Sequence, residues 1–82
     1  MSKCYYAGRY KIPEMFPQEL SFPKGYTIVN HNETHLKIEL FKGEKSFYLQ
    51  YLAAGEAANI WLQSGWIFTA DLEFEIKELE RP

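Results

Sequence analysis

The strongest constraint on the fold comes from two alternating segments, residues 36–42 and 45–51, on either side of Gly43 and Glu44. Gly43 and Glu44 suit a two-residue hairpin turn. Because side chains of a strand alternate between two faces, this turn fixes which residues face each other. The sequence therefore predicts an antiparallel hairpin with one apolar face. The predicted pairs are Lys42 with Lys45, Phe41 with Ser46, Leu40 with Phe47, Glu39 with Tyr48, Ile38 with Leu49, Lys37 with Gln50 and Leu36 with Tyr51.

Two other segments, residues 3–12 and 66–76, alternate in the same way, and we predict one strand from each. A strand as long as 66–76 must curve or carry a bulge in a small domain, which favours a strongly coiled sheet or a small barrel. The side chains predicted to face inward are Cys4, Tyr6, Tyr10 and Ile12 in the first segment, and Trp66, Phe68, Ala70, Leu72, Phe74 and Ile76 in the second.

Residues 26–30 are rich in strand-forming residues and are predicted to precede the hairpin in a meander. The connection is the polar stretch HNETH, whose Asn and Thr residues are typical of turns. A three-residue loop pairs Ile28 with Ile38, whereas a four-residue loop pairs Val29 with Leu36. The sequence leaves both registers open.

Residues 53–65 are compatible with two structures. The segment is rich in alanine, with Glu56 near its start and Gly65 at its end, and these features favour a short helix over residues 56–64. The alternative is a second hairpin, in which Ser64 and Gly65 form the turn between NIWLQ and WIFT. We adopt the helix as the prediction and keep the hairpin as the alternative.

These elements define a fold class. The chain has 82 residues, of which 46% are hydrophobic and 24% charged, which is typical of one folded domain. We predict a single small globular domain over residues 1–82 of the α+β class. Its architecture is a small curved antiparallel sheet or open β-barrel of about five strands, with one short helix before the last strand.

The expected compartment follows from two features. No apolar run approaches the length of a membrane span, and no signal-peptide pattern is visible. The single cysteine, Cys4, cannot form an internal disulfide, which agrees with a reducing compartment. We therefore expect a cytoplasmic protein without membrane contact, so the acceptor pattern Asn32-Glu33-Thr34 is not expected to be glycosylated.

The stretch NHNETH also contains two histidines four residues apart, His31 and His35. A zinc-protease signature needs such a pair on a helix with a glutamate directly after the first histidine. Here Glu33 comes one position too late, and the segment is predicted to be a turn. We expect no metal site and no cofactor, although the two histidines lie opposite each other if the loop has three residues.

Catalytic groups are scarce in this sequence. The candidate nucleophile is Cys4, with His31 or His35 as its base. Because Cys4 falls on the predicted apolar side of its strand, a buried structural cysteine is the preferred interpretation. We expect no enzymatic activity.

Charge is distributed unevenly along the chain, with a positive balance over residues 1–25 and a negative balance over residues 66–82. A basic and aromatic strand face formed by Lys3, Tyr5, Arg9 and Lys11 is the candidate for single-stranded nucleic-acid binding, which is our alternative function. The preferred interpretation is that this face forms cross-strand ion pairs with a neighbouring last strand, through Asp71, Glu73 and Glu75.

A proline-rich connector over residues 13–25 is predicted to be irregular and to end in a turn at residues 23–25. Its apolar residues are the candidates for contact with a protein partner: Met15, Phe16, Leu20 and Phe22. The expected function is a non-catalytic protein-binding module, such as a small viral or accessory inhibitor or regulator of a larger protein. An exposed edge strand also allows a homodimer, and nucleic acid is the less favoured partner.

Overall fold

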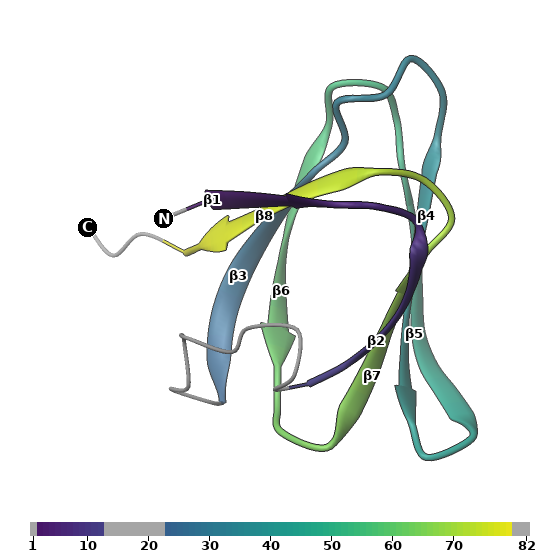
Figure 1. Ribbon diagram of the computed structural model, residues 1–82, viewed down its shortest axis with the longest axis vertical. Coiled ribbons are helices and arrows are strands. Elements are labelled where there is room, and N and C mark those ends of the chain that lie inside the picture. The colour runs from purple at the N-terminus through teal and green to yellow at the C-terminus, as the bar shows by residue number, and fades with distance from the viewer. Residues whose placement is uncertain (1, 13–22, 80–82) are drawn as a thin grey trace.

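The computed structural model describes residues 2–12 and 23–79, and every regular element in these ranges is a β-strand. The eight strands found there are β1 (Ser2–Tyr5), β2 (Gly8–Lys11), β3 (Lys24–Val29), β4 (Leu36–Lys42), β5 (Lys45–Leu52), β6 (Ala57–Leu62), β7 (Trp66–Ala70) and β8 (Phe74–Glu78) (Figure 1). A search of these residues for a helix long and apolar enough to span a membrane finds none.

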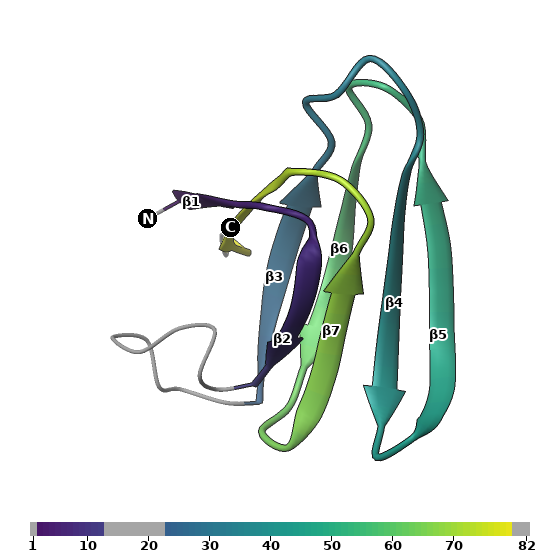
Figure 2. The same cartoon turned by 45° about the vertical axis from the view of Figure 1, so that its right-hand side comes forward.

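The strands form two antiparallel sheets of four strands each. Sheet A has the order β1-β8-β3-β6, and sheet B has the order β2-β7-β4-β5, so that β5 is the outermost strand of sheet B (Figure 2). The sheets do not close into a barrel within the described residues. The part of the chain that the structure describes is a small all-β domain, and the predicted α+β class with an open barrel and one helix is therefore wrong.

The inner faces of both sheets share one hydrophobic core. It contains three aromatic side chains, of which Phe68 is fully buried and lies edge-on to Phe74 with ring centroids 5.1 Å apart. Large rings bury much apolar area per residue, which suits a small domain. The core residues are Ile12, Tyr26, Ile28, Leu36, Ile38, Leu40, Leu52, Ile60, Leu62, Phe68, Ala70, Phe74 and Ile76.

The segment predicted to be a helix forms strand β6. Its residues alternate between buried and exposed, with Ile60 and Leu62 inside and Trp61 outside, and the strand pairs with β3. Packing of this alternating face therefore overrides the helix propensity of the alanines. The alternative was right about the turn at Ser64 and Gly65, but β6 and β7 belong to different sheets and do not form a hairpin.

The long strand predicted over residues 66–76 is divided into β7 and β8. Residues 71–73 form a bend that carries the chain from sheet B to sheet A. The predicted curvature is thus concentrated in one break. The inward row is confirmed for Phe68, Ala70, Phe74 and Ile76, all of which are buried.

A second break, at Tyr6 and Ala7, divides the predicted N-terminal strand into β1 and β2, and it also moves the chain between sheets. The two residues of the break invert the alternation in β1. Tyr5 therefore faces inward and stacks on Phe74 with ring centroids 5.6 Å apart, whereas Cys4 is exposed. Ile12 is buried as predicted, but the buried structural cysteine and the inward Tyr6 were wrong.

The predicted hairpin of β4 and β5 is confirmed at its turn, where Lys42 pairs with Lys45 and Phe41 with Ser46. A β-bulge at Phe47 then shifts the register by one residue, so the remaining predicted pairs are wrong. The bulge places Leu52 opposite Leu36, with both side chains fully buried. The observed pairs beyond the bulge are Leu40 with Tyr48, Glu39 with Leu49, Ile38 with Gln50, Lys37 with Tyr51 and Leu36 with Leu52.

The predicted meander is wrong in both of its registers. Strand β3 pairs with β6 and β8, so the stretch after it crosses from sheet A to sheet B. Lys24 and Gly25, predicted to lie in a turn, already belong to β3, and the Lys24 ammonium lies 2.6 Å from a Glu78 carboxylate oxygen on β8.

Candidate functional site

Strands β5 and β6 each end a sheet, and the open side of the molecule lies between them. Sheet B ends at β5 and sheet A ends at β6, with no pairing between the two strands among the described residues. An edge strand presents unpaired amide and carbonyl groups, which can pair with another strand. The side chains and main-chain groups along this open side are therefore the first candidates for a binding site.

The hydrogen bonds of β4 show which groups of β5 are free. The Asp71 amide donates to the Lys37 carbonyl oxygen at 3.2 Å, so the main chain of Lys37 points away from β5. In an antiparallel ladder, Lys37 and its opposite residue Tyr51 then form a non-hydrogen-bonded pair. The amide and carbonyl groups of Tyr51, and of Leu49 on the same side of the strand, point out of the free edge.

Strand β6 presents its main chain in the same manner. The Leu79 amide donates to the Gly25 carbonyl oxygen at 3.2 Å, which turns Gly25 toward β8 and away from β6. Trp61 lies opposite Gly25, so its amide and carbonyl point toward the open side, as do those of Asn59.

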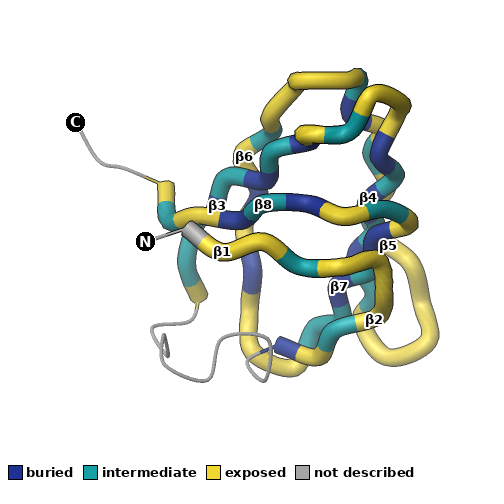
Figure 3. Tube along the Cα trace, turned by 45° about the horizontal axis from the view of Figure 1, so that its top comes forward, coloured by how far each residue is buried: buried dark blue, intermediate teal, exposed yellow. Residues whose placement is uncertain are grey.

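Exposed apolar side chains accompany these free groups on β5. Leu49 is 50% exposed and Tyr51 is 58% exposed, both on the outer face of sheet B, and Phe47 in the bulge is 44% exposed. Figure 3 shows the surrounding hairpin end as a continuous exposed segment. Strand β5 therefore combines free main-chain groups with a row of large apolar side chains.

A groove of about 260 Å³ lies between the two edges. Phe47 and Trp66 meet edge to face in its wall, with ring centroids 4.6 Å apart. The ammonium of Lys42 lies 5.9 Å from the Phe47 ring centroid and 5.8 Å from that of Trp66. The groove is lined by Leu40, Phe47, Tyr48, Asn59, Ile60, Trp61 and Trp66.

Tyr48 connects the groove to the edge of β5. Its hydroxyl donates to the side-chain carbonyl of Gln50, and desolvation by burial raises the pKa of its phenol above the ordinary value. The neutral hydroxyl thus remains a hydrogen-bond donor over the physiological range.

The outer face of sheet B carries charges of both signs. Arg9 and Lys11 on β2 and Lys37 on β4 are cationic. Glu39 lies 4.0 Å from the Lys37 ammonium, and the Asp71 carboxylate accepts a hydrogen bond from the Lys37 amide. The Arg9 guanidinium lies 5.5 Å from the ring centroid of Phe41. Next to β5 the charges of this face are Lys37, opposite Tyr51, and Glu39, opposite Leu49.

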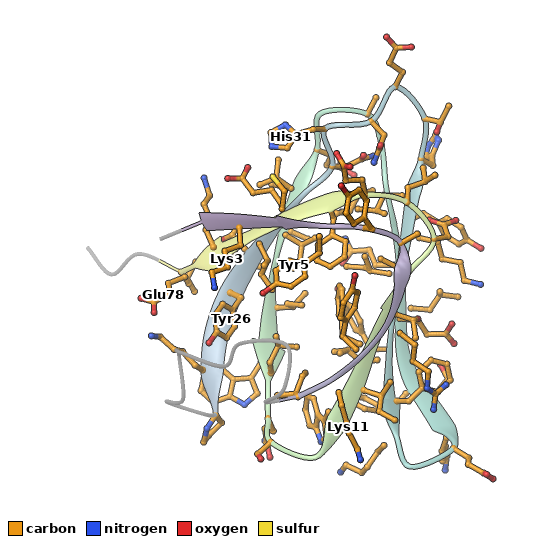
Figure 4. The ribbon with its side chains drawn as sticks, viewed as in Figure 1. Lys3, Tyr5, Lys11, Tyr26, His31 and Glu78 are labelled. Carbon is orange, nitrogen blue, oxygen red and sulfur yellow. The ribbon has the colours of Figure 1, made fainter. Side chains whose placement is uncertain are left out.

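The structure separates the four residues of the nucleic-acid hypothesis. Lys3 and Tyr5 belong to β1 in sheet A, whereas Arg9 and Lys11 belong to β2 in sheet B (Figure 4). The single basic strand face that was predicted is therefore wrong, and nucleic-acid binding stays an untested hypothesis.

The predicted ion pairing requires that the first and last strands are neighbours and that opposite charges face each other across them. The first and last strands are neighbours, as predicted, because β1 pairs with β8. The register, however, puts Lys3 opposite Ile76 and Arg9 opposite Thr69 rather than opposite carboxylates.

The interface candidates Met15, Phe16, Leu20 and Phe22 lie outside the described residues. Sequence reasoning missed the β5 edge instead. Both alternating rows of residues 47–52 contain apolar side chains, so the pattern does not say which row is buried. The one available signal was the absence of charge between Ser46 and Leu52.

The stretch NHNETH, residues 30–35, forms the connection between β3 and β4. His31 Nε2 lies 2.6 Å from a carboxylate oxygen of Glu75, and His35 is exposed. No group of three or more metal-ligating side chains occurs among the described residues.

Comparison of the chain with protein families, with curated proteins and with solved structures finds no match.

Proposed function

We propose that this protein is a non-catalytic protein-binding module that accepts an extended segment of a partner protein on the free edge of β5. The observation that carries the proposal is the combination at Leu49 and Tyr51: outward-pointing main-chain groups and half-exposed apolar side chains on one edge strand. Strand addition of this kind obtains affinity from main-chain hydrogen bonds and specificity from alternate side chains.

The composition of β5 supports this role. Soluble proteins protect sheet edges with lysine, proline, bulges or short strands. Strand β5 has its bulge and Lys45 near the hairpin turn, whereas residues 46–52 carry neither charge nor proline. The far half of the edge is therefore open to a partner strand.

Binding of this type suits a small inhibitor or regulator, because an added strand occupies a segment that the partner otherwise uses. Lys42 and Lys45, at the hairpin end of β5, favour a partner with acidic residues near that segment. The proposal thus specifies a negative charge on the partner segment as well as the strand that it contacts.

The experiment compares Leu49→Pro with Leu49→Ala in affinity capture from a lysate of the source organism, with and without nuclease. Proline removes the outward amide, whereas alanine keeps it and shortens the side chain. We expect a stoichiometric protein that resists nuclease, is retained by Leu49→Ala and is lost with Leu49→Pro. Circular dichroism and thermal unfolding verify that both variants are folded.

Equal capture by the two folded variants would place the contact elsewhere and overturn the proposal. Loss of all protein partners on nuclease treatment would instead favour the nucleic-acid alternative.

A further inference from the structure

The groove beside β5 restricts what the partner segment can be. Side chains of an added strand alternate between the two faces of the sheet. Those on the inner face lie beside Tyr48 and Gln50, whose side chains are on the inner side of β5, and Tyr48 is part of the groove wall. A strand added to β5 therefore projects every second side chain toward the groove.

The size and lining of the groove suit one large apolar group. A closed apolar cavity of about 150 Å³ holds a benzene molecule, and this groove measures about 260 Å³. The rings of Phe47 and Trp66 form an aromatic part of its wall, and aromatic rings pack favourably edge to face or offset.

The charges at one end of the groove indicate which residues flank this apolar side chain in the partner segment. Lys42 and Lys45 are both exposed and lie opposite each other on the two strands, so their ammonium groups repel. Within the described residues the ion pairs involve Lys24, His31 and Lys37, and neither of these two lysines. A carboxylate placed there relieves the repulsion and gains attraction from both cations.

We infer that the segment bound on β5 carries one large apolar side chain, which enters the groove between β5 and β6, and acidic residues next to it, which pair with Lys42 and Lys45. This inference rests on the proposed function and names the chemistry of its partner: an extended acidic segment with an aromatic or large aliphatic anchor. The attraction of opposite charges also steers its approach.

The test uses a displayed library of random peptides of about nine residues, long enough to cover a typical strand. Selection on the immobilised wild-type protein is expected to enrich peptides with one large apolar residue and adjacent Asp or Glu. Selection on the double variant Lys42→Glu, Lys45→Glu is expected to enrich Lys or Arg at the same positions.

An enriched peptide is then synthesised with a fluorophore for anisotropy titrations. Phe47→Ala, which removes part of the groove wall, is expected to raise Kd about tenfold. Tyr6→Ala removes an aromatic side chain that is 77% exposed and away from the groove, and is the matched control with an unchanged Kd. Replacement of the anchor in the peptide by alanine is expected to cause a similar loss.

The outcomes separate the two proposals. Peptides that bind Leu49→Ala but not Leu49→Pro, without acidic preference or sensitivity to Phe47→Ala, overturn the inference and leave strand addition in place. Peptides that bind both Leu49 variants equally, or no enrichment at all, overturn both. Self-association that is abolished by Leu49→Pro identifies a second copy of this chain as the occupant and also overturns the inference.

Discussion

The side-chain amide of Asn30 donates a hydrogen bond of 2.9 Å to the main-chain carbonyl of Leu52, in a position with no solvent exposure. The carbonyl oxygens of Thr34 and Ala53 also lie within 3.0 Å of this amide nitrogen, whose two N–H groups the three carbonyls share. The Asn30 side-chain oxygen accepts from the main chain and the side chain of Asn32. Asn30 thus joins the connection after β3 to the end of β5. A buried polar group with all its partners fixes one arrangement of these segments.

Asn30→Ala is expected to lower the free energy of unfolding by about 2–4 kcal/mol, because it leaves several buried polar groups without a partner. Asn59→Ala is the matched control. Asn59 is exposed, and its side chain accepts one hydrogen bond from Thr27, so a loss of no more than about 1 kcal/mol is expected. Urea denaturation measures both values, and equal losses would refute the central role of Asn30.

Alternation in the sequence predicts most of the strands, and it predicts two of their pairings, β4 with β5 and β1 with β8. Phe68 and Phe74 are inward because every second residue of their segment is apolar, and this could be predicted. The break at residues 71–73 could not, because it contains neither the proline nor the glycine that usually marks an interruption. Gly8 directly follows the break at Tyr6–Ala7 and can mark a bend, but it does not show that the chain changes sheets there. If the breaks are not recognised, β1 and β2 look like one long strand, and so do β7 and β8, although the two strands of each pair belong to different sheets.

The turn between β6 and β7 depends on Gly65, which has a φ of 94° and whose amide donates to the Ile12 carbonyl at 2.9 Å. A side chain is strained in this backbone conformation, so Gly65→Ala is expected to reduce stability by about 1–2 kcal/mol. Gly8→Ala is the control, since a Cβ there meets the Tyr10 ring at an ordinary 3.6 Å. Thermal unfolding distinguishes the two, and an unchanged midpoint for Gly65→Ala would contradict this reading of the turn.

The candidate site could be predicted only in part. The turn at Gly43 was predictable from its residues, whereas the bulge at Phe47 depends on burial of Leu52 against Leu36. Whether Leu52 or Tyr51 faces inward is decided by packing in the folded protein, because the sequence alternates equally well in both registers. The exposed row on β5 is a consequence of this single-residue shift.

Exposure of Cys4 gives a direct chemical test of the break after β1. The thiol is exposed in the folded protein, so an aromatic disulfide reagent is expected to modify it at a rate close to that of the urea-unfolded chain. Cys4→Ser should change stability by no more than about 0.5 kcal/mol, as for other exposed positions. Protection of the thiol by orders of magnitude in the folded state would instead restore the inward orientation of Cys4.

Stability at high pH should depend on Tyr5. Desolvation raises the pKa of its phenol above the ordinary 10.0, and the neighbouring Tyr10 raises it further because two phenolates repel. Below pH 10 the phenol is neutral in both the folded and the unfolded state, and its contribution to the free energy of unfolding is fully present. As the pH rises from 10 through the higher folded-state pKa, the unfolded chain loses its proton first, so the folded state binds more protons and stability falls.

Tyr5→Phe keeps the stacked ring and removes the titrating group, so its unfolding free energy is expected to fall less between pH 9 and pH 11 than that of the wild type. The double variant Tyr5→Phe, Tyr48→Phe should fall least, because burial also raises the pKa of Tyr48. All other ionisable groups are present in each of the three proteins, so the differences between their urea midpoints report on these two phenols. Identical slopes for all three would show that neither phenol is desolvated on folding.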